Sequence, residues 1–170
     1  MELRKYIYRE IQKPRQIWIW LIIMIIAAIM WYGFIQQIVF RVPFGDKPAP
    51  DLMLIIIWLI FGIMFPLVLI FYIKLIVEVR KDGIYLRFLP FHLHYRVFLF
   101  DEIDDYEVSE YRAMDFGGYG IRENFKGEKA YSMEGKKAVR LLLKNNKKIV
   151  IGSQKSDELV NAIDSVTKGG

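Results

Sequence analysis

Two histidines have the side chains best suited to bind a metal ion. His92 and His94 are two residues apart, so on a strand they would lie on the same face. Zinc needs three or four protein ligands, and the sequence offers no third partner at a useful spacing apart from the nearby acids. We therefore interpret both as turn or edge histidines, and predict no metal site and no other cofactor.

Five carboxylates follow the histidines and could suggest paired acid–base catalysis. They are Asp101, Glu102, Asp104, Asp105 and Glu107. Acid–base chemistry needs an enclosed pocket that separates two pKa values, whereas these residues open a strand beside exposed positions. We expect a solvated edge, whose charges discourage strand-to-strand aggregation, and no catalytic residue. The alternative function is an enzyme or metal-binding protein at the membrane surface that uses the histidines and these acids.

A glycine-rich segment, Gly117-Gly118-Tyr119-Gly120, could cradle a phosphate through its backbone N–H groups. It lacks the helix and lysine that follow a nucleotide-binding P-loop. Two interpretations stay open. The glycines serve tight turns or a bulge, or the loop contacts a ligand or partner. In the second case the predicted contacts are Gly117, Gly118, Tyr119 and Arg122.

The first sixteen residues form a basic arm with five basic and two acidic side chains. Leu3, Ile7 and Ile11 recur every four residues, which predicts a short amphipathic helix in the membrane interface, ended by Pro14. The predicted lipid contacts are Arg4, Lys5, Arg9, Lys13 and Arg15. A frayed tail is the other interpretation. If the arm packs on the following domain, its three apolar residues should be partly buried.

Two apolar runs, Ile17–Ile35 and Leu52–Ile73, contain no charged residue. A bilayer crossing needs about 20 apolar residues, so the sequence predicts a transmembrane hairpin over residues 17–73, with helices at 17–40 and 52–73. The lack of ionisable groups argues against an ion or proton pathway. Pro66 should be tolerated as a kink, because the neighbouring helix can cover the freed carbonyl. Basic flanks place both termini in the cytoplasm.

From residue 74 the apolar period changes to two, which predicts about seven short antiparallel strands. Asp-Gly at 82–83 is a strong hairpin signal. A two-residue turn there would pair Val79 with Leu86 and Glu78 with Arg87, with the apolar pairs on one face and the charged pair on the other.

The end of the chain predicts a second hairpin and a helix. A three-residue loop at 145–147 would pair Leu143 with Ile149 and Leu141 with Ile151. Ser156 is a suitable N-cap for a final helix. Its apolar stripe consists of Leu159, Ala162, Ile163 and Val166.

Composition limits the partners. The chain has no cysteine, which excludes disulfides and thiolate chemistry and suits a cytoplasmic domain. The net charge of +5 is concentrated in the basic arm, where an anionic membrane surface is the natural partner. Residues 74–170 are nearly balanced in charge, which argues against nucleic-acid binding.

Several short segments together resemble a known family. They are Glu10-Ile-Gln12, Gln16-Ile-Trp18, Arg80-Lys-Asp-Gly83, Gly117-Gly-Tyr-Gly-Ile-Arg122, Ala130-Tyr-Ser-Met-Glu-Gly135 and Ile151-Gly-Ser-Gln154. In this order they resemble an uncharacterised family of prokaryotic membrane proteins that joins a two-helix anchor to a pleckstrin-homology-like domain. The resemblance implies an α+β, multi-pass protein of the cell membrane, with an antiparallel barrel or sandwich over residues 74–170. It implies no catalytic residue.

The combined prediction is a membrane-anchored, non-enzymatic binding or scaffold module. Its partners would be the lipid bilayer and either a protein or anionic lipid head groups. The short loop at 81–83 carries an acid, so it does not have the long basic loop that inositol-lipid-binding domains use at that position. The oligomeric state stays open.

Overall fold

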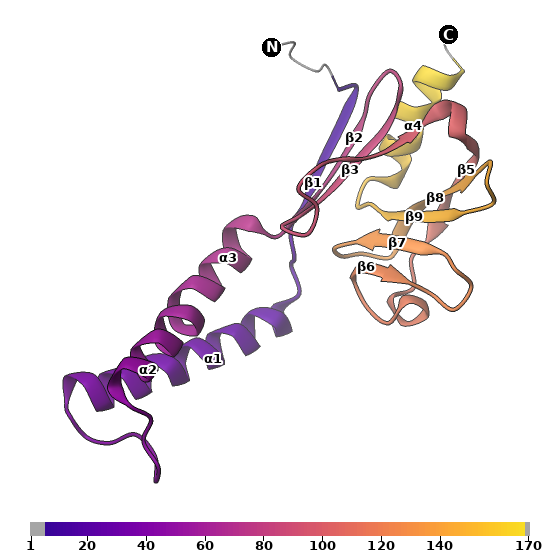
Figure 1. Ribbon diagram of the computed structural model, residues 1–170. Coiled ribbons are helices and arrows are strands. Elements are labelled where there is room, and N and C mark those ends of the chain that lie inside the picture. Colours follow the sequence, from indigo (N-terminus) through magenta and orange to yellow (C-terminus); the bar gives the residue numbers. More distant parts are fainter. Residues whose placement is uncertain (1–5, 169–170) are drawn as a thin grey trace. The chain divides into compact units, whose positions relative to one another are not determined.

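The computed structural model describes residues 6–168 and contains two compact units (Figure 1). One unit is a helical hairpin, Gln16–Ile73. The other, here called the folded domain, combines Met1–Arg15 with Lys74–Gly170. The basic arm is therefore part of the folded domain rather than a separate segment, and the domain is interrupted by the hairpin.

The hairpin contains two helices that are long and apolar enough to cross a membrane, Ile17–Val39 and Asp51–Tyr72. The first consists of α1 (Ile17–Phe34) and a wider, π-helical end, η1 (Ile35–Val39). The second consists of α2 (Asp51–Ile57), a π-helical stretch η2 (Trp58–Met64) and α3 (Phe65–Tyr72). The predicted helices at 17–40 and 52–73 are confirmed to within one residue at each end.

Aromatic side chains hold the two helices together. The Trp58 ring stacks on Phe34 with centroids 4.0 Å apart, and meets Trp31 edge-on at 5.1 Å. Trp31 also donates a hydrogen bond from Nε1 to the Gly62 carbonyl at 3.3 Å. Gly62 lies four residues before Pro66, which has no N–H to offer. The neighbouring helix thus donates a hydrogen bond to a carbonyl in the turn before Pro66.

The first sheet of the folded domain has four antiparallel strands in the order β1-β2-β3-β4. They are β1 (Tyr8–Gln12), β2 (Lys74–Val79), β3 (Gly83–Leu89) and β4 (Arg96–Leu99). The chain leaves this sheet after β1, forms the whole hairpin, and returns to it in β2. Gln12 and Leu75 are paired neighbours even though the hairpin lies between them in sequence.

The prediction of an amphipathic helix in the basic arm is wrong, because residues 8–12 form β1. A spacing of four fits one turn of a helix, but it is also an even number and so fits one face of a strand. Ile7 and Ile11 are about half exposed, at 47% and 49%, whereas Glu10 and Gln12 are buried. The arm does dock on the domain, but with its polar face inward. Leu3 lies outside the described residues.

The second sheet has five strands in the order β5-β8-β9-β7-β6. The strands are β5 (Ile103–Glu110), β6 (Gly120–Glu123), β7 (Lys129–Ser132), β8 (Lys137–Leu143) and β9 (Lys148–Gly152). Two short 3-10 turns, η3 (Phe100–Glu102) and η4 (Ala113–Phe116), lie before β5 and before β6.

The prediction for this domain is an antiparallel barrel or sandwich, and the described strands form two separate sheets rather than a closed barrel. Residues 6–168 contain nine strands rather than about seven, and no strand pairing among them joins the two sheets. The additional strands are β1 and β6, whose alternation is weakened by polar residues. In addition, β7 runs parallel to β9. A parallel pair between non-consecutive strands has no turn of its own, so it leaves no local signal in the sequence.

Both predicted hairpin registers are wrong by two residues. Val79 pairs with Ile84 and Glu78 with Tyr85, because the turn lies one residue earlier than Asp82-Gly83. In the same way Leu141 pairs with Ile149, with a loop over 144–146. A shift of two keeps every side chain on its predicted face. Gly83 is the first residue of β3 and pairs with Leu99. A Cβ at this position would lie 2.4 Å from the Phe98 carbonyl oxygen on β4.

The core lies between the two sheets and is closed by α4 (Ser156–Thr167), which contacts β2, β5 and β8. Leu159 and Ile163 of this helix are fully buried, as the predicted apolar stripe requires. The prediction of Ser156 as the N-cap is wrong, because Lys155 is the N-cap and Ser156 is the first residue of the helix. The core also contains fully buried side chains from both sheets, including Leu75, Val77, Leu86, Val139 and Ile151.

Candidate ligand-binding site

The glycine-rich segment forms a tight loop over the second sheet. Gly117, Gly118 and Gly120 all have positive φ, at 71°, 120° and 114°, which side chains with a Cβ rarely adopt. The Tyr111 ring stacks on Phe116 and on Tyr119, with centroids 5.2 and 5.7 Å away. The Tyr111 hydroxyl donates to the Gly118 carbonyl at 2.7 Å. These contacts explain the glycines as a structural requirement of the loop.

A pocket of about 370 Å³ lies where this loop enters β6, and we call it the β6-edge pocket. It is lined by Phe88, Phe91, Tyr119, Gly120, Ile121 and Arg122. One wall comes from β3 and the turn after it, and the other from three consecutive residues of β6 and the residue before them. Of the four predicted contacts, Tyr119 and Arg122 reach this pocket, whereas Gly117 and Gly118 do not line it.

The two faces of β6 lie beside different groups of side chains. Ile121 pairs with Tyr131, whose ring lies 5.8 Å from that of His92. Arg122 pairs with Ala130, which belongs to the buried cluster beneath the glycine-rich loop. The Arg122 Nε donates to the Tyr119 carbonyl at 3.2 Å, which holds the start of this side chain along the strand. Its guanidinium is at the exposed rim of the pocket.

His92 lies in a cationic environment that does not suit a metal ion. The Arg96 Nε donates to His92 Nε2 at 3.2 Å, and the backbone N–H of Phe88 points at Nδ1 at 3.3 Å. A neutral imidazole has only one acceptor nitrogen, so only one of these two hydrogen bonds can form at a time. Partial burial, together with the positive charges of Arg96 and Lys129, lowers the pKa of His92. All of these effects favour the neutral ring.

The acidic residues do not gather into a site. Asp101, Glu102, Asp104, Asp105 and Glu107 are all exposed, and β5 is an edge strand of its sheet. This placement is the one expected for a solvated edge. Within residues 6–168, no three histidines or carboxylates are grouped so that they could hold a metal ion. His94 is exposed, whereas His92 is partly buried.

The predicted lipid contacts of the basic arm divide into three groups. Arg9 lies on β1 and forms an ion pair with the buried Glu78 at 3.3 Å. Lys13 and Arg15 are exposed in the segment between β1 and α1. Arg4 and Lys5 fall outside the described residues. Arg9 therefore has a structural partner within the folded domain, whereas Lys13 and Arg15 remain predicted lipid contacts.

Glu78 anchors a polar network on the outer face of the first sheet. It is 4% exposed and accepts hydrogen bonds from Arg80 and from the Tyr95 hydroxyl, the latter at 3.0 Å. The Arg80 guanidinium lies over the Tyr85 ring, 4.0 Å from its centroid. Sequence reasoning paired Glu78 with Arg87, and so missed this network. The signal for it is a set of Arg and Tyr residues around Glu78, with Arg9 on β1, Arg80 directly after β2 and Tyr85 on β3.

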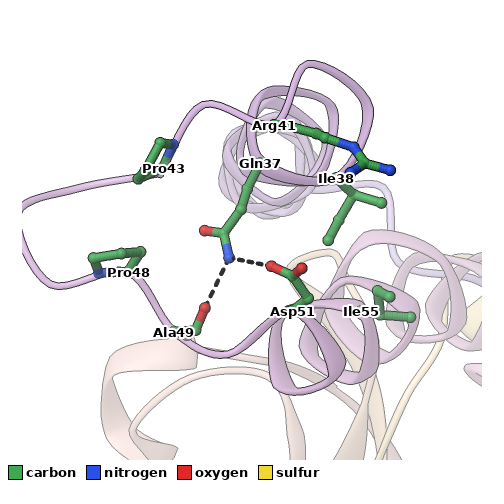
Figure 2. Close-up of a pocket in the computed structure, with 8 residues that line it drawn as sticks. All are labelled: Gln37, Ile38, Arg41, Pro43, Pro48, Ala49, Asp51 and Ile55. Atoms are coloured by element: carbon green, nitrogen blue, oxygen red, sulfur yellow. Dashed lines mark hydrogen bonds between the residues drawn. The ribbon is translucent and has the colours of Figure 1, made fainter.

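The hairpin contains a second pocket, of about 570 Å³, in the link between its helices (Figure 2). Gln37 extends into the loop, and its Nε2 donates to the Ala49 carbonyl and to Asp51 Oδ1, both at 2.8 Å. Its Oε1 accepts from the backbone N–H of Phe44 at 3.3 Å. Since the amide is fully engaged, we interpret Gln37 as the group that shapes the link.

The β6-edge pocket was only partly predictable. Tyr119 and Arg122 followed from the glycine-rich motif, whereas Phe88 and Phe91 come from a distant hairpin. The sequence carried one weak signal for the second pair, because Phe91 is a large apolar residue in a turn. In the structure it is 70% exposed.

Comparison with known proteins gives a family but no relative of known role. No curated protein and no solved structure matches the chain. A pleckstrin-homology-like domain therefore finds no support among them. Residues 2–169 match a protein family described as a family of unknown function, DUF6141. Because this match covers nearly the whole chain, the protein belongs to the DUF6141 family.

Proposed function

We propose that this protein is a membrane-anchored, non-enzymatic binding module. Its hairpin spans the membrane, and its folded domain binds a partner at the β6-edge pocket. The observation that carries the proposal is the pocket itself, which combines aromatic walls with an exposed guanidinium along an edge strand. Apolar pockets with a few placed polar groups are the usual form of a binding site.

The membrane part of the proposal rests on the two apolar helices and on their flanks. Basic residues precede the first helix and follow the second, which favours a cytoplasmic location for both termini and for the folded domain. Two sheets followed by a C-terminal helix are also an arrangement that a distant pleckstrin-homology-like domain would have. An experimental structure of the folded domain would test that relationship.

Cysteine labelling tests the orientation, and the absence of native cysteine gives a clean background. Lys47→Cys lies in the hairpin link and should react with an impermeant maleimide in intact cells. Lys147→Cys lies in the turn between β8 and β9 and should react only after permeabilisation. The opposite pattern would place the folded domain outside the cell and contradict the proposed topology.

Site-specific photo-crosslinking tests the binding function. A photoreactive amino acid at Phe91 should give defined adducts in native membranes, and these should disappear when Arg122→Glu is added. The same amino acid at Lys147, an exposed position outside the pocket, is the matched control. Equal adducts from both positions would argue against the pocket. A stoichiometric metal that is lost in a His92→Ala, His94→Ala double variant would contradict the non-enzymatic binding role.

A further inference from the structure

The β6-edge pocket follows an unpaired strand edge. In the second sheet β6 is the outermost strand and pairs only with β7, within the part of the chain that the structure describes. In an antiparallel pair, alternate residues of an edge strand direct their N–H and C=O groups away from the partner strand. Gly120, Ile121 and Arg122, three of the four residues of β6, line the pocket. The pocket therefore offers backbone hydrogen-bonding groups as well as apolar surface.

Positive charge lies on both faces of the sheet near this edge, with Arg122 on β6, Lys129 on β7 and Arg96 on β4. Arg122 is on the face that carries the glycine-rich loop, and Arg96 and Lys129 are beside His92 on the other. Across residues 6–168, none of these three cations has a carboxylate within ion-pair distance. Glu123, opposite Lys129 on β6, is the acid nearest to this group in the strand pairing. A ligand that complements the edge would therefore be anionic.

We propose that an extended, acidic segment of a partner protein adds to the free edge of β6 as a further strand. One apolar side chain would enter the pocket between Phe88 and Phe91. Because side chains of a strand alternate between faces, acidic residues of the segment would reach Arg122 on one side and Arg96 and Lys129 on the other. This inference rests on the proposed function, since it takes the β6-edge pocket as the binding site.

The geometry favours a peptide over a lipid for this site. An acyl chain would use the apolar walls but would leave the backbone groups of β6 unpaired. A peptide strand satisfies those groups, and strand addition to an exposed edge takes its affinity from them. Gly120 helps because it has no side chain to block the approach, and an added Cβ there would have no atom within 4 Å. The space beside Gly120 is thus open.

The probe is a fluorescent peptide of about eight residues with a central Phe and with Glu at both odd and even positions around it, so that each face of the strand carries acidic side chains. The full chain is placed in phosphatidylcholine nanodiscs, and binding is followed by fluorescence anisotropy. We expect saturable binding of this peptide and none of a Lys-for-Glu analogue. Arg122→Glu should weaken binding by about tenfold or more. Lys147→Glu, with the same change in net charge outside the pocket, should leave it unchanged.

Backbone methylation of the probe tests strand addition directly. Two peptides are compared, each N-methylated on one set of alternate residues. One set should abolish binding, because its N–H groups pair with β6, and the other should be tolerated. Equal binding of both methylated peptides, or of the acidic and basic probes, would overturn the inference.

A test for lipid labelling distinguishes failure of this inference from failure of the proposed function. If the acidic peptide fails to bind, but a photoreactive residue at Phe91 labels phosphatidylglycerol in nanodiscs, the peptide inference is wrong and the binding module stands. If position 91 gives no Arg122-dependent adduct in native membranes either, both fail. Amide exchange of β6 and β7 in Arg122→Glu shows that loss of binding is not loss of fold.

Discussion

The Glu10 carboxylate on β1 accepts a hydrogen bond of 2.6 Å from the Ser153 hydroxyl, across 143 residues of sequence. It also accepts the backbone N–H of Gln154 at 2.9 Å and the Tyr8 hydroxyl at 2.9 Å. Gln12 adds a bond from its Nε2 to the Gly152 carbonyl at 2.7 Å. Burial and the nearby carboxylate raise the pKa of Tyr8 above its usual value. The first strand is therefore fastened to the turn before α4.

Replacing Glu10 should destabilise the folded domain. Glu10→Ala leaves the Ser153 hydroxyl and the Gln154 N–H without an acceptor in a buried place, so we expect a loss of about 2–4 kcal/mol in the free energy of unfolding. Glu110→Ala, at an exposed position on β5, should change it by less than about 0.5 kcal/mol. All four tryptophans lie in the hairpin, so amide exchange rather than tryptophan fluorescence should be measured. Equal stability of the two variants would contradict the fastening role.

The two tyrosines beside Arg80 make a matched pair for the Glu78 network. Tyr95→Phe removes a hydrogen bond to a buried carboxylate, and should cost about 1–2 kcal/mol. Tyr85→Phe removes a bond to the exposed Asp82, and should cost less than about 0.5 kcal/mol. Denaturant unfolding followed by amide exchange measures both. A larger loss in Tyr85→Phe would show that the energetic centre of the network lies elsewhere.

Gly83 is required by the close approach of two strands. In Gly83→Ala the new methyl group would lie 2.4 Å from the Phe98 carbonyl oxygen and 2.9 Å from the Leu99 Cα. Both are backbone atoms, so β3 and β4 must separate, and we expect a loss of about 3 kcal/mol or more. Gly127→Ala, with positive φ but open space around it, should cost about 1 kcal/mol. Similar losses at the two positions would count against this explanation.

His92 should make the stability of the domain depend on pH. Its pKa in the folded state lies below its ordinary value of 6.5, so at intermediate pH the unfolded chain binds more protons. The contribution is complete above about pH 6.5 and is lost as the pH falls through the folded-state pKa. Unfolding curves from about pH 7.5 to 5 should show this loss. It should disappear in His92→Gln and persist in His94→Gln, and an unchanged slope in His92→Gln would contradict the assignment.

The sequence was most informative where a pattern is long and local. The two apolar helices were predicted to within a residue, because about 20 consecutive residues in each carry the same apolar signal. A hydrogen bond from the neighbouring helix to a carbonyl before Pro66 was also expected from general principles. The C-terminal helix was clear from its acidic first turn and from the spacing of Leu159 and Ile163. Each of these features depends on residues that are close in sequence.

Features that depend on distant pairing were missed. Strand β1 has only five residues, and its buried members, Glu10 and Gln12, are polar. Their partners lie more than a hundred residues away, so composition alone favoured the wrong face. The turn before β3 lies one residue earlier than the turn signal predicts. The close approach of Gly83 to Phe98 depends on the neighbouring strand, and rules for turns do not include it. Likewise, the β6-edge pocket needs Phe88 and Ile121 from different sheets, and only Tyr119 and Arg122 were accessible to motif reasoning.

The interruption of the first sheet by the hairpin fixes an order of events during synthesis. Strand β1 leaves the ribosome first, but its partner β2 follows only after residues 13–73 have been made. Until then β1 has neither its sheet nor the turn before α4 to bind. A contact between ends so far apart in sequence forms late in folding. Completion of the folded domain thus requires that the hairpin has been translated in full, and a chain that stops within the hairpin would have a first strand without its partner strand.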